Sequence, residues 1–361
     1  MSKVEVVQRH MQPLCFLPSG KLVAYRFGKV FILENDRVEK TIKIFSSIKE
    51  TILGRCQWIS RLLRLGIRAT EVIDENNILI SVSNTIFELN LKDGILSSGY
   101  YCGKGIRPLM FAQVSDVSSV KKGIYFGEYL SNPDKHEVDI YRRTGVDKWS
   151  VVHTFKQGEI NHIHAIIPDK YRDCLWVFTG DFDESAAIWK VTDDFNNVER
   201  ILCAKQAYRG CVAFAIEEGL LYATDAPFAS NSIFLMNPFT YDLKEIAPIN
   251  GSCIYGCKWR DNYVFSTTVE GDGRNTSRME FYFGRKRGAG IKNDYVYLYI
   301  GNPINGFKEI YKARKDCLPY YTFQFGVFKF PSGNNMGREL YFQPIAVVGT
   351  DLKLMKVKWD L

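Results

Sequence analysis

Two histidines and an aspartate stand at the ends of two neighbouring predicted strands. The first strand begins around Asn161 and carries His162 and His164, and the second ends at Asp181. A polar turn separates the strands, so in an antiparallel pair these two ends lie side by side. Side chains alternate along a strand, which places both histidines on the same side. We expect two imidazoles and a carboxylate to meet at one edge of a sheet.

This combination of side chains suits three kinds of chemistry. The histidine pair can bind a divalent metal together with the carboxylate, or act as a base and its orienting partner. It can also simply donate hydrogen bonds to backbone carbonyls. We interpret His162, His164, Asp181 and the following Tyr208 as the catalytic candidates. We assign no metal ligand from the sequence, but a divalent metal at His162, His164 and Asp181 stays open as a cofactor.

The elements that position these residues belong to a repeat. A unit of about fifty residues recurs, with an apolar strand, a second strand rich in β-branched and aromatic residues, and an outer hairpin. The units span 13–47, 68–98, 107–155, 161–204, 208–249, 254–313 and 322–359. Seven such units predict an all-β fold, a β-propeller of about seven four-stranded blades. Six blades are an alternative, because the first unit is short and residues 46–64 fit the pattern poorly.

The domain organisation follows from the same repeat. No linker rich in proline or serine interrupts it, so we expect residues 1–361 to form a single propeller domain. The segment near 48–65 has mixed helical character and is interpreted as an irregular or helical insertion. A long loop is expected near 271–292, where glycines interrupt the strand pattern.

A ring of ionisable side chains is predicted at one face of the propeller. Innermost strands start and second strands end around the central channel, so residues at these positions share one cavity. Arginine suits a carboxylate or phosphate because its planar fork donates two parallel hydrogen bonds. The alternative is that each arginine pairs with a neighbouring carboxylate of the protein. The residues that we predict to bind substrate are Arg68, Arg107, Arg209, Glu128 and Asp225.

Charge and cysteine content narrow the class of partner and the compartment. A net charge of +7 permits an acidic ligand but is mild for 361 residues, so no nucleic-acid partner is expected. No segment approaches the roughly 18 apolar residues that cross a bilayer, so no membrane span is expected. Nine cysteines without C-x-x-C pairs fit neither a disulfide framework nor a zinc site. We therefore expect a cytoplasmic protein.

One hairpin carries a resemblance to a known motif. Residues 138–152 contain Gly145 near the turn and Trp149 in the returning strand. This hairpin resembles the Asp-box, S-x-D-x-G-x-T-W, of sialidase-like and BNR-repeat propellers. At its Ser, Asp and Thr positions stand Arg142, Thr144 and Lys148. The resemblance covers one hairpin and implies the sialidase-like propeller fold, in which the Asp-box is a structural turn.

The resemblance and the predicted ring together point to a carbohydrate-active protein of bacterial polysaccharide metabolism. We expect an acidic oligosaccharide or polysaccharide at the top face, where a lyase or glycoside hydrolase cleaves its glycosidic bond. In the lyase scheme, Arg107 or Arg209 neutralises a uronate carboxylate, and His162 or His164 removes the neighbouring proton. Tyr208 then protonates the leaving oxygen. Some polysaccharide lyases on propeller folds use His, Tyr and Arg in a similar way.

Three other interpretations stay open. In a hydrolase scheme, the acid and the base or nucleophile stand about 5 to 9 Å apart and are two of Asp181, Asp225, Glu128 and Asp183. A non-catalytic propeller that binds a glycan or a protein needs none of this chemistry. A metal at the histidine pair would suit hydrolysis of a small phosphorylated or lactone substrate. An open, positive pocket with His164 and Tyr208 exposed favours the enzyme, whereas a dry cluster of paired arginines and aspartates favours the scaffold.

Overall fold

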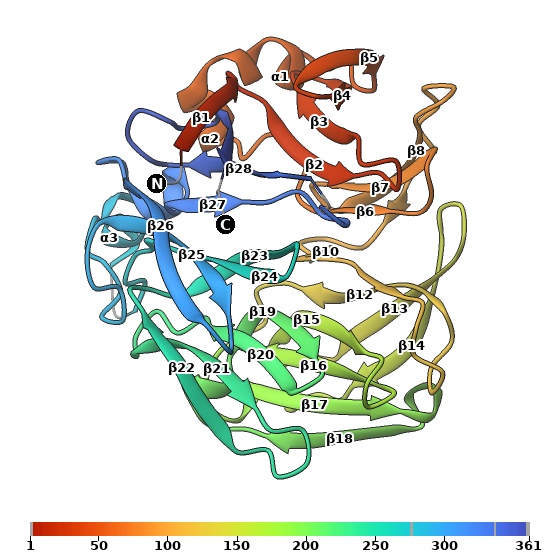
Figure 1. Cartoon of the computed structure of the whole chain (residues 1–361), viewed down its shortest axis with the longest axis vertical. Coiled ribbons are helices and arrows are strands. Elements are labelled where there is room, and N and C mark those ends of the chain that lie inside the picture. Colours follow the sequence, from red (N-terminus) through yellow and green to blue (C-terminus); the bar gives the residue numbers. More distant parts are fainter. Residues whose placement is uncertain (1–2, 275–276, 336, 359–361) are drawn as a thin grey trace.

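Seven antiparallel sheets stand side by side in a ring, each with its innermost strand at the centre (Figure 1). The computed structural model describes residues 3–274, 277–335 and 337–358. Each sheet fills four strand positions from the channel to the rim, so the fold is an all-β, seven-bladed propeller. This confirms the fold predicted from the repeat and excludes the six-bladed alternative.

Blades 1 to 3 take their strands in chain order from the centre outward. Blade 1 consists of β2 (Gln12–Phe16), β3 (Leu22–Arg26), β4 (Lys29–Glu34) and β5 (Arg37–Lys43). Blade 2 consists of β6 (Thr70–Val72), β7 (Asn77–Val82), β8 (Thr85–Asn90) and β9 (Tyr100–Tyr101). In blade 3, two short strands share the innermost position, and the strands are β10 (Arg107–Pro108), β11 (Ala112–Val114), β12 (Gly123–Tyr129), β13 (Val138–Gly145) and β14 (Lys148–Phe155).

Blades 4 to 6 repeat this order. Blade 4 consists of β15 (His162–Asp169), β16 (Cys174–Gly180), β17 (Ala187–Thr192) and β18 (Asn197–Leu202). Blade 5 consists of β19 (Gly210–Ile216), β20 (Gly219–Thr224), β21 (Asn231–Met236) and β22 (Leu243–Ile249). Blade 6 consists of β23 (Cys253–Trp259), β24 (Asn262–Thr267), β25 (Tyr295–Asn302) and β26 (Gly306–Arg314).

The two ends of the described chain share blade 7. Its inner strands are β27 (Val327–Lys329), β28 (Glu339–Ile345) and β29 (Leu354–Lys358), and its outer strand is β1 (Lys3–Gln8). The first and last strands pair antiparallel, with Val4 opposite Val357. Backbone hydrogen bonds between the two ends of the described chain therefore close the ring.

Apolar side chains fill the space between neighbouring blades. All seven residues of β16 are buried, because this strand is covered on both faces. Blades 3 and 4 come close together at Gly127, where a Cβ atom would lie 2.4 Å from Cγ2 of Ile163. Only glycine fits at this position, so the glycine lets the inner strands of the two blades pack together.

Short helices interrupt the ring in a few loops. The segment near 48–65 holds α1 (Ile48–Thr51), η1 (Leu53–Arg55) and α2 (Gln57–Leu62), and the loop near 271–292 holds α3 (Arg278–Phe283). The remaining helices are η2 (Asp183–Ser185), η3 (Asp193–Phe195), η4 (Gln206–Tyr208) and α4 (Tyr320–Phe323). No helix among the described residues is long and apolar enough to span a membrane.

A buried arginine fixes the helical insertion to blade 7. The side chain of Arg61 in α2 is 1% exposed and donates through Nε to the carbonyl oxygen of Phe323 at 2.9 Å. Its guanidinium also pairs with Asp316 and, at 3.3 Å, with Asp351. The insertion is thereby held against the segment before β27 and the loop between β28 and β29, and its residue Arg64 lines a cavity with Lys329 of blade 7.

The hairpin of β13 and β14 supports the propeller fold but not the sialidase family. Gly145 and Trp149 are four positions apart, whereas the glycine and tryptophan of the Asp-box are three apart. The turn residue Asp147 accepts hydrogen bonds from Ser97 Oγ at 2.7 Å and from the backbone N–H of Gly99 at 3.0 Å. The turn therefore ties blade 3 to blade 2, which is a structural role.

Replacing Arg61 by methionine is expected to destabilise the fold by about 3 to 5 kcal/mol, because Asp351 and Asp316 would lose a buried counter-charge. Urea unfolding of the variant measures this loss. The matched control is Arg55→Met in the same insertion, since Arg55 is exposed and its loss should cost about 0.5 kcal/mol or less. Equal stability of the two variants would contradict the role given to Arg61.

Candidate functional site

A cluster of two histidines and an aspartate lies where β15 begins and β16 ends. His162 is the first residue of β15 and stands opposite Gly180, the last residue of β16, so Asp181 follows beside it. The Nε2 atoms of His162 and His164 are 2.9 Å apart. Asp181 Oδ1 lies 3.3 Å from Nε2 of His162 and 3.2 Å from Nε2 of His164. The three side chains converge at one end of blade 4.

Burial and hydrogen bonding set the protonation of this cluster. Burial lowers the pKa of His164, which is 2% exposed, although its hydrogen bond to Asp181 acts in the opposite direction. Burial also disfavours ionised Asp181, but its contacts with Nε2 of both histidines and the charge of Arg209 hold its pKa well below the usual value. His162 donates from Nδ1 to the carbonyl oxygen of Leu130 at 2.8 Å, since a carbonyl only accepts. In neutral His162, Nε2 is therefore an acceptor.

Arg209 neutralises the acidic side of the cluster. Its Nη2 atom lies 2.9 Å from Asp181 Oδ1 and 3.2 Å from Asp225 Oδ2. The Cys211 thiol donates a weak hydrogen bond to the same oxygen of Asp225 at 3.4 Å. Although burial opposes it, these two carboxylates raise the pKa of Arg209. Arg209 thus forms ion pairs with carboxylates of the protein. This agrees with the alternative interpretation of the channel arginines, in which they do not bind a substrate anion.

Glu270 is a further buried acidic residue in this half of the channel. Its carboxyl group is buried and accepts a hydrogen bond from the hydroxyl of Ser252. Burial, together with the charge of Asp225, raises the pKa of Glu270 to about 8. At neutral pH most of this carboxyl group therefore keeps its proton.

The opposite half of the channel carries positive charge that the protein does not neutralise. We call Arg64, Arg68, Arg107 and Lys329 the cationic cluster. Burial, with the charges of Arg107 and Arg64, lowers the pKa of Arg68 to about 10. Burial, with the charge of Arg68, lowers the pKa of Lys329 to about 8. Among the described residues, no carboxylate forms an ion pair with any member of the cluster.

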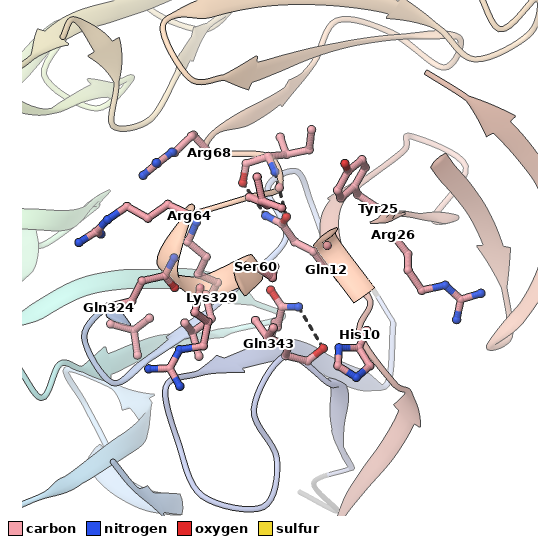
Figure 2. Close-up of a pocket in the computed structure, with 18 of the residues that line it drawn as sticks. His10, Gln12, Tyr25, Arg26, Ser60, Arg64, Arg68, Gln324, Lys329 and Gln343 are labelled. Atoms are coloured by element: carbon pink, nitrogen blue, oxygen red, sulfur yellow. Dashed lines mark hydrogen bonds between the residues drawn. The ribbon is translucent and has the colours of Figure 1, made fainter. Parts of the chain in front are cut away.

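Two cavities adjoin the cationic cluster. The first has a volume of about 170 Å³ and is lined by Arg64, Arg68, Tyr255, Lys329 and Gln324, among others. Figure 2 shows the two arginines on one side of this cavity, with Gln324 and Lys329 across from them. The second cavity, of about 240 Å³, is also lined by Arg68, Tyr255 and Lys329. The histidine cluster lines neither cavity, although Cys211 next to it lines the second.

Tyr129 joins the two halves of the channel. The guanidinium of Arg107 lies 5.2 Å from the centre of its ring. The ring centres of Tyr129 and His162 are 4.5 Å apart. A ligand held by Arg107 would therefore lie near both the phenol and the imidazoles. The sequence interpretation overlooked Tyr129 and chose its neighbour Glu128.

Two predicted residues lie outside these clusters. Glu128 accepts hydrogen bonds from the backbone N–H of Asp139 at 3.1 Å and from the Tyr141 hydroxyl at 3.2 Å, between β12 and β13. Side chains alternate along β12, so Glu128 and Tyr129 point to opposite faces. Tyr208 ends η4 and packs against the apolar cluster between blades 4 and 5. Tyr129 could have been found from the sequence by applying the alternation of side chains to each residue of β12.

Two groups of side chains bring metal-ligating atoms together within the described part of the chain. One is His162, His164 and Asp181, and the other is His164, Cys211 and Asp225. In each group the candidate ligand atoms lie within 4.8 Å of one another. Only the first group has a partly open side, because the Asp181 side chain is 31% exposed.

Comparison with known proteins shows the fold. No protein-family model and no curated protein matches the chain. It is similar to the extracellular domain of BT4673 from B. thetaiotaomicron, described as a hybrid two component system (TM-score 0.55, 11% identity, 100% of this chain and 40% of that chain). It is also similar to the AfRom2 CNH domain (TM-score 0.53, 9% identity, 99% of this chain and 99% of that chain). A chain of the Mitotic Checkpoint Complex is similar as well (TM-score 0.53, 8% identity, 99% of this chain and 91% of that chain). At these identities the likeness shows a propeller and no activity.

Glu270 should make stability depend on pH. Its pKa is about 8 in the folded protein against 4.5 ordinarily, so folding keeps a proton that the unfolded chain releases. Between these values the free energy of unfolding falls as the pH rises, by up to about 1.4 kcal/mol per pH unit. Urea unfolding across this range should show the slope in the native protein and a reduced slope in Glu270→Gln. The prediction fails if the two proteins lose stability in parallel.

Proposed function

We propose that this propeller binds an acidic carbohydrate in its central channel, with the acidic group on the cationic cluster. The observation that carries the proposal is the set of four cations that share the channel without a carboxylate partner among the described residues. Holding like charges together in a partly buried channel costs free energy of folding. A bound carboxylate, sulfate or phosphate offsets that cost.

The remaining lining favours a sugar as the carrier of the acidic group. Gln324 and Gln343 supply amides to the first cavity, and Tyr255 lines both cavities. Amides bond hydroxyl groups, and aromatic rings pack on the apolar faces of sugar rings. The channel therefore combines an anion site with neutral polar and aromatic surface, which suits an acidic oligosaccharide of bacterial polysaccharide metabolism. The cytoplasmic location expected from the cysteines stays a prediction.

Cleavage of the bound glycan is the second part of the proposal, and Tyr129 is the observation that favours it. Its ring connects Arg107 to His162, so it takes the position that we predicted for Tyr208 in the lyase scheme. Arg107 would neutralise the uronate, and Tyr129 would protonate the leaving oxygen. Against this, His164 is almost fully buried, which is closer to the non-catalytic alternative. Binding and cleavage are therefore tested separately.

Acidic oligosaccharides should bind to the full-length protein, and neutral oligosaccharides of the same length should not. Arg68→Gln and Arg107→Gln should each weaken binding about tenfold or more, because each removes a charge-assisted hydrogen bond worth about 1.5 to 3 kcal/mol. Isothermal titration calorimetry measures both effects. The control is Arg37→Gln, which removes the same charge from the exposed outer strand β5.

Equal affinity for acidic and neutral sugars would overturn the binding proposal, as would unchanged affinity in both channel variants. The same mixtures are then examined for cleaved products. New unsaturated ends indicate a lyase, and new reducing ends without unsaturation indicate a hydrolase. Tight binding without either product indicates that the propeller binds the glycan but does not cleave it.

Arg68 and Arg61 should respond in opposite ways to the loss of charge. Arg68→Met is expected to stabilise the ligand-free protein by about 1 kcal/mol, because it removes an unneutralised cation from the channel. Arg61→Met is expected to destabilise it, because that arginine has carboxylate partners. Thermal unfolding in the absence of ligand compares the two variants. A loss of stability in Arg68→Met would show that this arginine serves the fold and not a ligand.

A further inference from the structure

We propose that His162, His164 and Asp181 bind a divalent transition-metal ion of the zinc class, with an open coordination position on the exposed side of Asp181. The inference rests on the positions of three ligand atoms and on the bonds around them. It does not depend on the acidic sugar proposed above.

The first argument is the triangle of ligand atoms. Its edges are 2.9 Å between the two Nε2 atoms, and 3.2 Å and 3.3 Å from these atoms to Asp181 Oδ1. A metal that bonds nitrogen and oxygen at about 2.0 to 2.2 Å requires ligand atoms about 2.8 to 3.1 Å apart for octahedral angles and about 3.3 to 3.6 Å apart for tetrahedral angles. The three atoms thus already stand near the spacing of one face of a coordination sphere.

The second argument is the number of protons available. Because His162 gives its Nδ1 proton to Leu130, its neutral ring has a lone pair at Nε2. Asp181 Oδ1 is an acceptor and already receives a bond from Arg209 at 2.9 Å. His164 can supply one proton at most from Nε2, so a single proton must serve the two contacts to His162 and Asp181. A cation with three accepting lone pairs around it satisfies all three atoms.

The third argument concerns the second ring nitrogen, Nδ1, of each histidine. The bond from Nδ1 of His162 to a carbonyl is the support that metal-binding histidines usually have. Nδ1 of His164 is buried and has no hydrogen-bond partner among the described residues. The same is true of Oδ1 of Asp225. A ligand nitrogen of His164 lies within 4.8 Å of a ligand atom of Asp225. A metal at Nε2 would place the proton of neutral His164 on Nδ1.

The backbone is also shaped around the second imidazole. A Cβ atom at Gly180 would lie 2.2 Å from Cε1 and 2.4 Å from Nε2 of His164. Glycine therefore makes the space in which the ring of His164 lies against the end of β16. A position that admits only glycine at a ligand atom indicates a site built for close approach.

Charge and donor type indicate the class of metal. Asp181 and Asp225 carry two negative charges against one positive charge on Arg209, so the neighbourhood has a net negative charge that attracts a cation. Two imidazoles and one carboxylate suit zinc, iron(II) or manganese(II) and leave at least one position for water or a ligand. The 31% exposure of the Asp181 side chain provides the open side.

The test uses the full chain, stripped with a chelator and then dialysed against Zn²⁺, Mn²⁺ or Co²⁺ alone. About one equivalent of metal per chain is expected by elemental analysis, and the metal should raise the melting temperature, because it binds only the folded state. Asp181→Asn and His162→Gln should each weaken binding about tenfold or more. The control His136→Gln alters an exposed histidine outside the cluster and should leave binding unchanged.

Co²⁺ also allows a second measurement of metal binding that does not depend on the stability of the protein. Its visible absorption should show nitrogen and oxygen ligands, and the band should be lost in Asp181→Asn while circular dichroism shows a folded chain. Failure of the native protein to retain any of the three metals overturns the proposal. Equal metal content in the native protein and both cluster variants also overturns it, because the metal would then be held elsewhere. Arg68→Gln should keep the metal, which separates this result from the test of sugar binding.

Discussion

The pairing of β1 with β29 is the constraint on which the rest of the structure depends. It joins the first described strand to the last, so all seven sheets stand around one axis. Residues that are far apart in the sequence then become neighbours across the channel. Arg64 lies on the helical insertion and Lys329 in blade 7, yet both line the same cavity. The channel therefore exists only because the ring is closed.

Charge is distributed unequally around this channel, and the difference separates structural from functional side chains. Arg209 lies between Asp181 and Asp225, so its burial is compensated and it holds blades 4 and 5 together. Arg68 has the same side chain and a similar position at the start of a blade, but its closest charges are positive. One arginine is paired by carboxylates of the fold, and the other has no carboxylate partner among the described residues.

The sequence was sufficient for the fold because its period is carried by many strands at once. Its apolar alternation and turns recur in every blade, so a poor match in residues 46–64 did not alter the conclusion.

The meeting of His162, His164 and Asp181 was also predictable, since antiparallel pairing of two consecutive strands decides it. The pairing of Arg209 depends on contacts between blades, and the burial of Arg61 depends on an insertion without a repeat. Neither is encoded in local periodicity. Glu128 was chosen over Tyr129 because alternation within β12 was not followed to the last residue.

Tyr129 shows why the two clusters need to be considered together. Arg107 and His162 both contact its ring, so any displacement of Tyr129 changes both contacts. The pKa of its hydroxyl is raised by burial and by the charges of Asp181 and Asp225, which keeps the phenol protonated at neutral pH. A protonated phenol can donate a hydrogen bond to an anion that Arg107 holds, and it cannot do so as a phenolate. The negative half of the channel therefore keeps this donor ready for a ligand that the positive half attracts.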